Sequence, residues 1–289
     1  MQAKTILITG ANDGIGLATA ERLAHHDVQL ILACRDEKKG LAAAQRIGKI
    51  TGNTRSLVIA LDLASFASVA AAAEFILTEH PKIDVLINNA GLYTQQLLFT
   101  KEGYELQFGV NHLGHFLLTL LLIPAFQCLN EGLGRVINVS SAAHLRGKLD
   151  FNRLRGEEGP RRYLGMAAYG QSKLANILFT KELARRYPND FTANCLHPGL
   201  VSTRFGNKAA GPLVSCIWNL YKPLARKPSR GADTSVYLAL SPEVNNVSGR
   251  YFDQRQCIRK PAPLACDAQL AAQLWDYSQA AVADYLPKP

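Results

Sequence analysis

The chain has 289 residues, nearly half of them apolar, which favours one or two domains built around a large buried core. Its net charge is +9, but no helix-turn-helix, zinc or aromatic-repeat motif accompanies the basic residues, so nucleic-acid binding is not expected. The six cysteines are scattered without a C-x-x-C pair, and no signal peptide is recognised, which argues against a secreted protein. No apolar run is long enough to span a bilayer, so the sequence predicts a soluble, cytoplasmic protein.

Strand-like and helix-like stretches alternate along the chain. Runs rich in Val and Ile predict buried strands at 5–10, 28–34, 57–63, 83–91, 135–141 and 192–199. Helix-forming stretches lie between them at 16–26, 36–50, 65–80 and 104–122, with Asp36 and Ser65 as N-caps. This alternation predicts an α/β fold, with a doubly wound, Rossmann-like parallel sheet and helices on both faces in one domain spanning 1–289.

Two stretches interrupt the alternation. The polar segment 143–165 predicts a loop. The segment 205–231 mixes apolar, proline and basic residues and predicts an insertion on the substrate side. Its apolar part, 213–224, suits a lid over a substrate, a weak contact with a membrane surface, or a core helix, and these alternatives stay open.

The first predicted strand ends in "TGANDGIG", residues 9–16, with glycines at 10, 14 and 16. A glycine turn between a buried strand and a helix is the context of a phosphate cradle, because backbone N–H groups and the helix dipole then face an anion. The spacing differs from G-x-G-x-x-G, so a simple flexible turn remains the alternative.

The end of the second predicted strand reads Cys34-Arg35-Asp36. A carboxylate at this tip would bind the ribose 2′-hydroxyl of NAD, whereas an arginine would pair with a 2′-phosphate. Cys34 is neutral and Asp36 suits an N-cap, so Arg35 predicts NADP(H) in preference to NAD(H).

The pair Tyr169 and Lys173 in "YGQSK" is spaced one helical turn apart, within a helix expected at about 166–186. Interconverting a carbonyl and an alcohol needs a proton donor and acceptor, and a tyrosine acts so near neutral pH only if its pKa is lowered by about 2–3. We expect the lysine ammonium to supply much of this lowering and the positive charge of an oxidised nicotinamide to add to it. A hydroxyl from "NVSS" is expected to hold the substrate oxygen. Alternation along the strand lets either Ser140 or Ser141 face the site.

The motifs together resemble the short-chain dehydrogenase/reductase family over essentially the whole chain. They are "TGANDGIG", "LDL" (61–63), "NNAG" (88–91), "GVNHLGHF" with Asn111, "NVSSAAH", "YGQSK" and "HPGLVST" (197–203). The resemblance implies that hydride passes between the nicotinamide and the substrate carbon.

The resemblance also implies roles for residues. Tyr169 is the proton donor/acceptor, Lys173 lowers its pKa and binds the nicotinamide ribose, Ser141 orients the substrate oxygen, and Asn111 holds a relay water. The implied cofactor contacts are Gly10, Asn12, Asp13, Gly14, Ile15, Gly16, Arg35, Asp62, Leu63, Asn89, Ala90, Gly91, Tyr169, Lys173, Pro198, Gly199 and Thr203. No metal is expected, because His112 and His115 have no third ligand nearby.

Within this family the chain is similar to the retinol-dehydrogenase-like branch, through "ILACRDEKKG", "VNHLGHFLLT", "SKLANILFTKELARR" and "LWDYS". That similarity implies NADP(H) and a lipophilic small-molecule alcohol, aldehyde or ketone, although we expect this protein to lack the N-terminal membrane anchor of many members. The alternatives are a reductase of a polar ketone or a C=C bond, and a non-catalytic NADP-binding redox sensor. The resemblance implies pairing through the helices that carry Asn111 and Tyr169, but homodimer versus monomer stays open.

Overall fold

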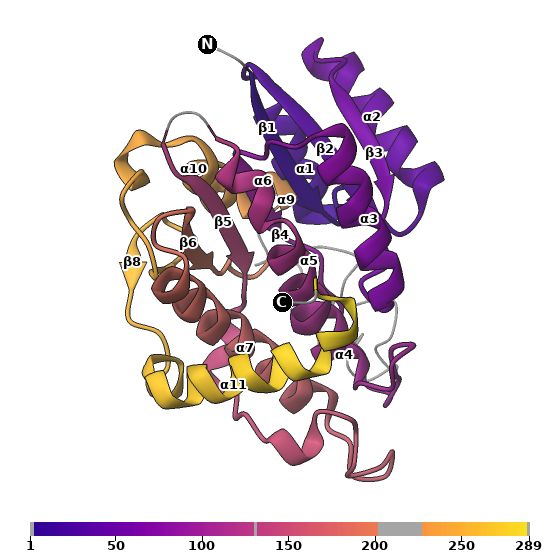
Figure 1. The fold of residues 1–289 in the computed structure, drawn as a ribbon, viewed down its shortest axis with the longest axis vertical. Helices are drawn as coiled ribbons and strands as arrows, with labels where there is room; N and C mark the ends of the chain where they lie inside the picture. Colours follow the sequence, from indigo (N-terminus) through magenta and orange to yellow (C-terminus); the bar gives the residue numbers. More distant parts are fainter. Residues whose placement is uncertain (1–2, 130–131, 202–226, 288–289) are drawn as a thin grey trace.

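The computed structural model describes residues 3–129, 132–201 and 227–287. In these residues, eight strands form one sheet in the order β3-β2-β1-β4-β5-β6-β7-β8 (Figure 1). Their bounds are β1 Lys4–Thr9, β2 Val28–Cys34, β3 Ser56–Ala60, β4 Val85–Asn88, β5 Gly134–Val139, β6 Phe191–Leu196, β7 Tyr251–Phe252 and β8 Ile258–Arg259. All pairings are parallel except that of β8 with β7.

Helices cover both faces of the sheet (Figure 1). Their bounds are α1 Gly14–Leu23, α2 Glu37–Thr51, α3 Phe66–Glu79, α4 Leu106–Phe108, α5 Gly114–Leu121, α6 Ile123–Gln127, α7 Gly165–Arg186, α9 Pro228–Gly231, α10 Asp233–Leu240 and α11 Ala268–Ala281. In β1, Leu7 packs into the core beneath α3, α5 and α7, while Ile6 and Ile8 pack into the core beneath α1 and α10. The α/β class, the doubly wound sheet and the two-sided helical cover are therefore confirmed.

The sequence predicts the helix starts more accurately than the strand ends. Asp36 caps α2 and Ser65 caps α3, as predicted. The third and fourth strands end earlier than predicted, because Asp62 and Asn89 lie in turns stabilised by hydrogen bonds. The strands β7 and β8, two residues each, carry too short a pattern to have been recognised.

The helix expected at 104–122 is interrupted. A π-helical turn, Gly109–Leu113, separates α4 from α5, and the Gly114 N–H bonds the Gly109 carbonyl five residues back. A Cβ at Gly114 would lie 2.6 Å from the Leu63 carbonyl oxygen, so contact with a distant loop sets the path of this segment. Apolar periodicity does not report such a contact.

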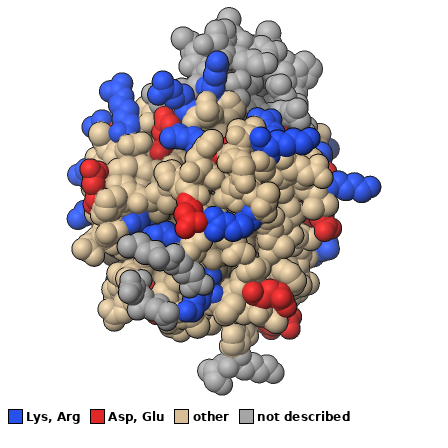
Figure 2. Space-filling view, turned by 90° about the horizontal axis from the view of Figure 1, so that it is seen from above, with Lys and Arg blue, Asp and Glu red and all other residues tan. Residues whose placement is uncertain are grey.

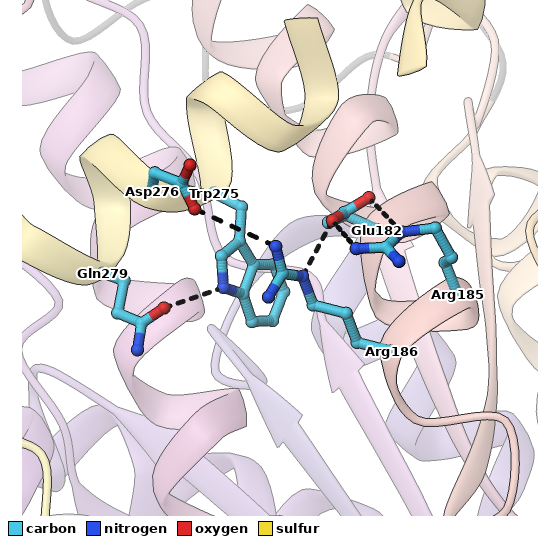
Figure 3. Close-up of polar contacts among 6 residues, drawn as sticks. All are labelled: Glu182, Arg185, Arg186, Trp275, Asp276 and Gln279. Atoms are coloured by element: carbon cyan, nitrogen blue, oxygen red, sulfur yellow. Dashed lines mark hydrogen bonds and ion pairs between the residues drawn. The ribbon is translucent and has the colours of Figure 1, made fainter. Parts of the chain in front are cut away.

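The helix α11 lies across α7 (Figures 1 and 3). Trp275 is buried and stacks edge-on against Phe116, with ring centroids 5.0 Å apart. The Arg186 guanidinium lies 4.5 Å from the centre of the Trp275 ring and also bonds Glu182 at 2.7 Å. These contacts dock the C-terminal helix on the helix that carries Tyr169.

On the face drawn in Figure 2, basic side chains are spread from the edges to the middle, with more of them in the upper half and acidic side chains among them. The predicted insertion 205–231 lies outside the described residues except for 227–231, so its role stays a prediction. No helix in the described part of the chain is both long enough and apolar enough to cross a membrane.

Candidate active site

The glycine turn lies at the carboxyl end of β1, beside β4, where the order of the strands reverses. Ligands of doubly wound sheets bind at such a switch point. Gly10 and Gly14 have positive φ angles of 65° and 56°, and α1 begins at Gly14. A Cβ at Gly16 would lie 2.3 Å from the Gly10 carbonyl oxygen. Only glycine fits there, and the turn presents the start of a ten-residue helix, as a diphosphate cradle requires.

The rest of this turn and its neighbour complete the cradle. Asn12, Gly14 and Ile15 are partly exposed and Asp13 caps α1. Just after β4, the Asn89 side chain donates to the Thr9 carbonyl at 2.8 Å, and the Asn89 and Ala90 amides both donate to the Thr9 hydroxyl. The turn after β4 is thereby tied to the turn after β1. These residues fit a dinucleotide, and their contacts with one stay a prediction.

At the tip of β2, the side chains of Cys34, Arg35 and Asp36 differ in whether a ligand could bind them. The Asp36 carboxylate accepts the Lys39 amide at 3.1 Å and pairs with its ammonium, and these bonds lower the pKa of Asp36. Cys34 is buried. Arg35 is exposed, so its guanidinium is the group at this tip that an incoming phosphate can reach.

The other predicted cofactor contacts lie at the same edge of the sheet. Asp62 and Leu63 follow β3, and the Asp62 carboxylate accepts the Ala64 amide. Pro198 and Gly199 follow β6, and Gly199 has a φ of 79°. Thr203 lies outside the described residues.

Tyr169, Ser141 and Lys173 come together beside this edge. The Tyr169 hydroxyl is hydrogen-bonded to the Ser141 side chain. The Lys173 ammonium lies 5.7 Å from the centre of the Tyr169 ring and donates to the Val139 carbonyl at 3.0 Å. Ser140 instead donates to the Lys173 carbonyl at 2.7 Å inside the protein. Alternation along the strand allowed either serine to face the site. In the fold, it is Ser141 that lies beside the tyrosine.

The pKa of Tyr169 differs from the expectation. Burial raises it to about 12, although the bond to Ser141 opposes this. Burial also lowers the pKa of Lys173 to about 8. The nearby lysine ammonium therefore does not by itself bring the pKa of Tyr169 below its usual value. Desolvation by the protein outweighs the favourable effect of the ammonium on the phenolate, and the charge of a bound oxidised nicotinamide would act in the same direction as the lysine.

Asn111 lies in the π-helical turn and faces Gly91. Its Oδ1 accepts the Leu92 amide at 2.8 Å, and its Nδ2 donates to the Leu92 carbonyl and to Ser172 Oγ, both at 3.0 Å. A Cβ at Gly91 would lie 3.3 Å from both Asn111 Oδ1 and Lys173 Nζ. The absent side chain at position 91 leaves room beside the lysine, as the predicted cofactor channel requires.

Three residues of the site lacked a sequence signal for their contacts. His144 donates from Nδ1 to the Ser141 carbonyl at 2.7 Å and accepts the Ala262 amide at Nε2. These two hydrogen bonds fix the backbone at Ser141, so the role of His144 is structural. Thr9 and His115 bond one another at 2.9 Å from positions 106 residues apart. Among the described residues, no three potential metal ligands cluster.

Comparison with known proteins places these features in a family. The sequence profile of the short chain dehydrogenases matches residues 4–152. Retinol dehydrogenase 14 of Homo sapiens is 42% identical over 299 residues, covering 98% of this chain and 87% of that protein. Retinol dehydrogenase 13 of Homo sapiens is 44% identical over 277 residues, covering 94% and 82%.

Solved structures agree. An uncharacterised protein from Mycobacterium paratuberculosis superposes with a TM-score of 0.77 and 34% identity, covering 97% of this chain and 93% of that one. A 3-ketoacyl-(acyl-carrier-protein) reductase from Brucella melitensis, solved with NADH, gives a TM-score of 0.66 and 26% identity, covering 87% and 96%.

Proposed function

The chain belongs to the short-chain dehydrogenase family and is an oxidoreductase of alcohol and carbonyl groups, and from this premise we propose its cofactor, its substrate class and its proton donor. We propose that it interconverts an alcohol and a carbonyl on a lipophilic small molecule with NADP(H), using Tyr169 as proton donor and acceptor. The observation that carries the proposal is the bond between Tyr169 and Ser141, one helical turn from the buried Lys173.

The chemistry of these side chains follows from their positions. A bound nicotinamide supplies or accepts the hydride. Ser141 and Tyr169 both offer a hydroxyl to one substrate oxygen, and the tyrosine passes its proton to that oxygen during reduction and takes it back during oxidation. Lys173 holds positive charge behind the phenol, which stabilises the phenolate formed when the proton leaves.

NADP(H) is supported by the charges at the tip of β2. Arg35 is exposed, and Asp36 is already occupied as the N-cap of α2. A guanidinium can bind a 2′-phosphate with two hydrogen bonds. The Brucella reductase was solved with NADH. Family membership therefore supports a nicotinamide cofactor, whereas the preference for a cofactor with a 2′-phosphate is supported by Arg35.

A lipophilic substrate is supported by exposed apolar side chains in the segments that carry Ser141 and Tyr169. Leu145 follows Ser141 in a 3₁₀ turn, Leu164 is the N-cap residue of α7, and Met166 lies in the first turn of that helix. These three side chains are 63%, 69% and 60% exposed. Exposed apolar groups beside a polar reacting centre favour a ligand with an apolar body and one polar end.

The test is turnover of purified protein with NADPH and a series of aldehydes and ketones of increasing chain length. We expect kcat/KM to rise with chain length, and Tyr169→Phe to lower kcat about 100-fold or more without loss of NADPH binding. Ser140→Ala is a matched control, because that hydroxyl bonds the helix backbone. Undiminished turnover by Tyr169→Phe would remove the assigned proton donor. Selective turnover of polar ketones or C=C bonds would support a reductase of that kind, and NADPH binding without any turnover would support a redox sensor.

A cytoplasmic location, expected from the sequence, and the choice between homodimer and monomer both stay predictions. Fractionation of cells that express the full chain and light scattering of the purified protein test them.

A further inference from the structure

Two buried histidines remain unused by the proposed chemistry. His112 and His115 lie in and just after the π-helical turn that carries Asn111, and both are almost fully buried. His115 Nε2 lies 2.9 Å from the Thr9 hydroxyl, and its Nδ1 lies 3.1 Å from the Asn111 carbonyl oxygen. The ring therefore spans from the end of β1 to the turn behind the reacting groups.

The Asn111 carbonyl fixes the tautomer of the His115 ring, because a carbonyl only accepts and Nδ1 must therefore carry the proton. Nε2 is then an acceptor for the Thr9 hydroxyl at 2.9 Å, which is shorter than the distance of 3.4 Å from that hydroxyl to its other acceptor, the Ile87 carbonyl. The same Thr9 oxygen accepts the Asn89 amide at 3.0 Å and the Ala90 amide at 2.9 Å. One chain of donors thus runs from the turn after β4, through Thr9 and His115, to Asn111.

A second connection joins the same two turns. The Asn111 amide group bonds both the N–H and the carbonyl of Leu92, and also bonds Ser172, which precedes Lys173 on α7. The turn 89–92 is therefore held at both ends against the turn 109–113. Neither end can shift without breaking buried hydrogen bonds, which are costly to leave unmade.

We propose that His115 is a positioning residue that couples the cofactor-side turn 89–92 to Asn111 and, through it, to the helix segment that carries Lys173. This inference rests on the proposed function, because the turn 89–92 is the predicted wall of the cofactor channel. Burial, with a contribution from the nearby Lys173 charge, holds the pKa of His115 down to about 3. The ring stays neutral at working pH, which the direction of its hydrogen bonds requires.

His112 offers a matched control. It is as buried as His115 and lies three residues before it in the chain, but its Nε2 bonds Ser278 on α11 at 2.8 Å. Its ring packs among Phe108, Phe116 and Phe179. His112→Phe therefore removes a buried hydrogen bond without touching Thr9 or the turn 89–92.

The first measurement is hydrogen exchange, which needs no turnover. We expect His115→Phe to speed exchange of the Asn89 and Ala90 amides about tenfold, because Thr9 loses its fixed orientation. His112→Phe should leave these amides unchanged. Equal exchange in the two variants overturns the coupling.

The second measurement is kinetic. We expect His115→Phe to weaken NADPH binding and to lower kcat, each about tenfold, which corresponds to about 1.4 kcal/mol. His112→Phe should change both by less than twofold despite a similar loss of thermal stability. Thr9→Val should weaken NADPH binding and lower kcat as His115→Phe does, whereas Thr9→Ser, which keeps the hydroxyl, should retain wild-type values. The double variant Thr9→Val with His115→Phe should be no worse in either quantity than the poorer single variant.

The outcomes separate the two claims. If the wild-type protein neither binds NADPH nor turns over, the proposed function fails, and exchange at Asn89 and Ala90 still decides the coupling. If the wild type is active and the effects of the Thr9 and His115 changes simply add, the coupling fails alone. Should His115→Phe not fold, His115→Gln and the Thr9 variants provide the same comparison, and additive effects there refute the inference.

Discussion

Replacing Lys173 with methionine should stabilise the protein while abolishing its activity. The side chain is 3% exposed, and burial lowers its pKa from 10.5 to about 8. Because one pKa unit corresponds to about 1.4 kcal/mol, keeping this lysine charged in the folded protein at pH 7 costs about 3 kcal/mol. Methionine has a similar length and no charge to desolvate.

One hydrogen bond opposes this gain. Lys173 donates to the Val139 carbonyl, and losing that bond costs about 1 kcal/mol. The carbonyl keeps a second donor, because Asn176 Nδ2 lies 3.3 Å away. We therefore expect Lys173→Met to raise the free energy of unfolding by about 2 kcal/mol at pH 7.

The sign of the pH dependence follows from the lowered pKa. Between about pH 8 and 10.5 the unfolded wild-type chain binds more protons at this residue than the folded chain, so wild-type stability rises with pH. The advantage of Lys173→Met is full below pH 8 and shrinks as pH rises towards 10.5.

Urea unfolding of both proteins at pH 7 and pH 10 measures this difference. Lys181→Met, on the same helix at a partly exposed position, is the control and should change stability by no more than about 0.5 kcal/mol. A destabilised Lys173→Met at pH 7, or an advantage that is the same at both pH values, would refute the reasoning.

Three further predictions concern other parts of the molecule. Arg35→Ala should weaken NADPH binding about 10- to 100-fold and NADH binding less than about threefold, as cofactor fluorescence can show; equal losses would exclude a 2′-phosphate contact. Gly16→Ala should abolish cofactor binding or folding, because its Cβ would lie 2.3 Å from the Gly10 carbonyl oxygen; wild-type binding and Tm would contradict the packing of the cradle. Trp275→Ala should lower the free energy of unfolding by about 3–5 kcal/mol in a denaturant titration, because Trp275 is 3% exposed and packs against α5 and α7. A loss below about 1 kcal/mol would show that α11 adds little to the stability of the fold.

Much of the fold was readable from the sequence because its signals are local. Apolar runs separated by helix-forming stretches predicted the doubly wound sheet, and short polar side chains at helix starts predicted the caps of α2 and α3. The spacing of Tyr169 and Lys173 needed only the helix period, and α7 places them one turn apart. These features depend on neighbours within a few residues, so one chain carries enough information.

The remaining features depend on residues that are far apart in the chain. Alternation along β5 could not say which serine meets Tyr169, because that depends on where α7 packs. Composition could not show the π-helical turn at Asn111 or the bond between Thr9 and His115, because neither has a local period. The sign of the Tyr169 pKa shift was also decided by the tertiary structure, since burial is a property of the packed molecule. The sequence alone determined which residues carry the chemistry predicted here, whereas the tertiary structure decided which of their polar groups are occupied and which remain available.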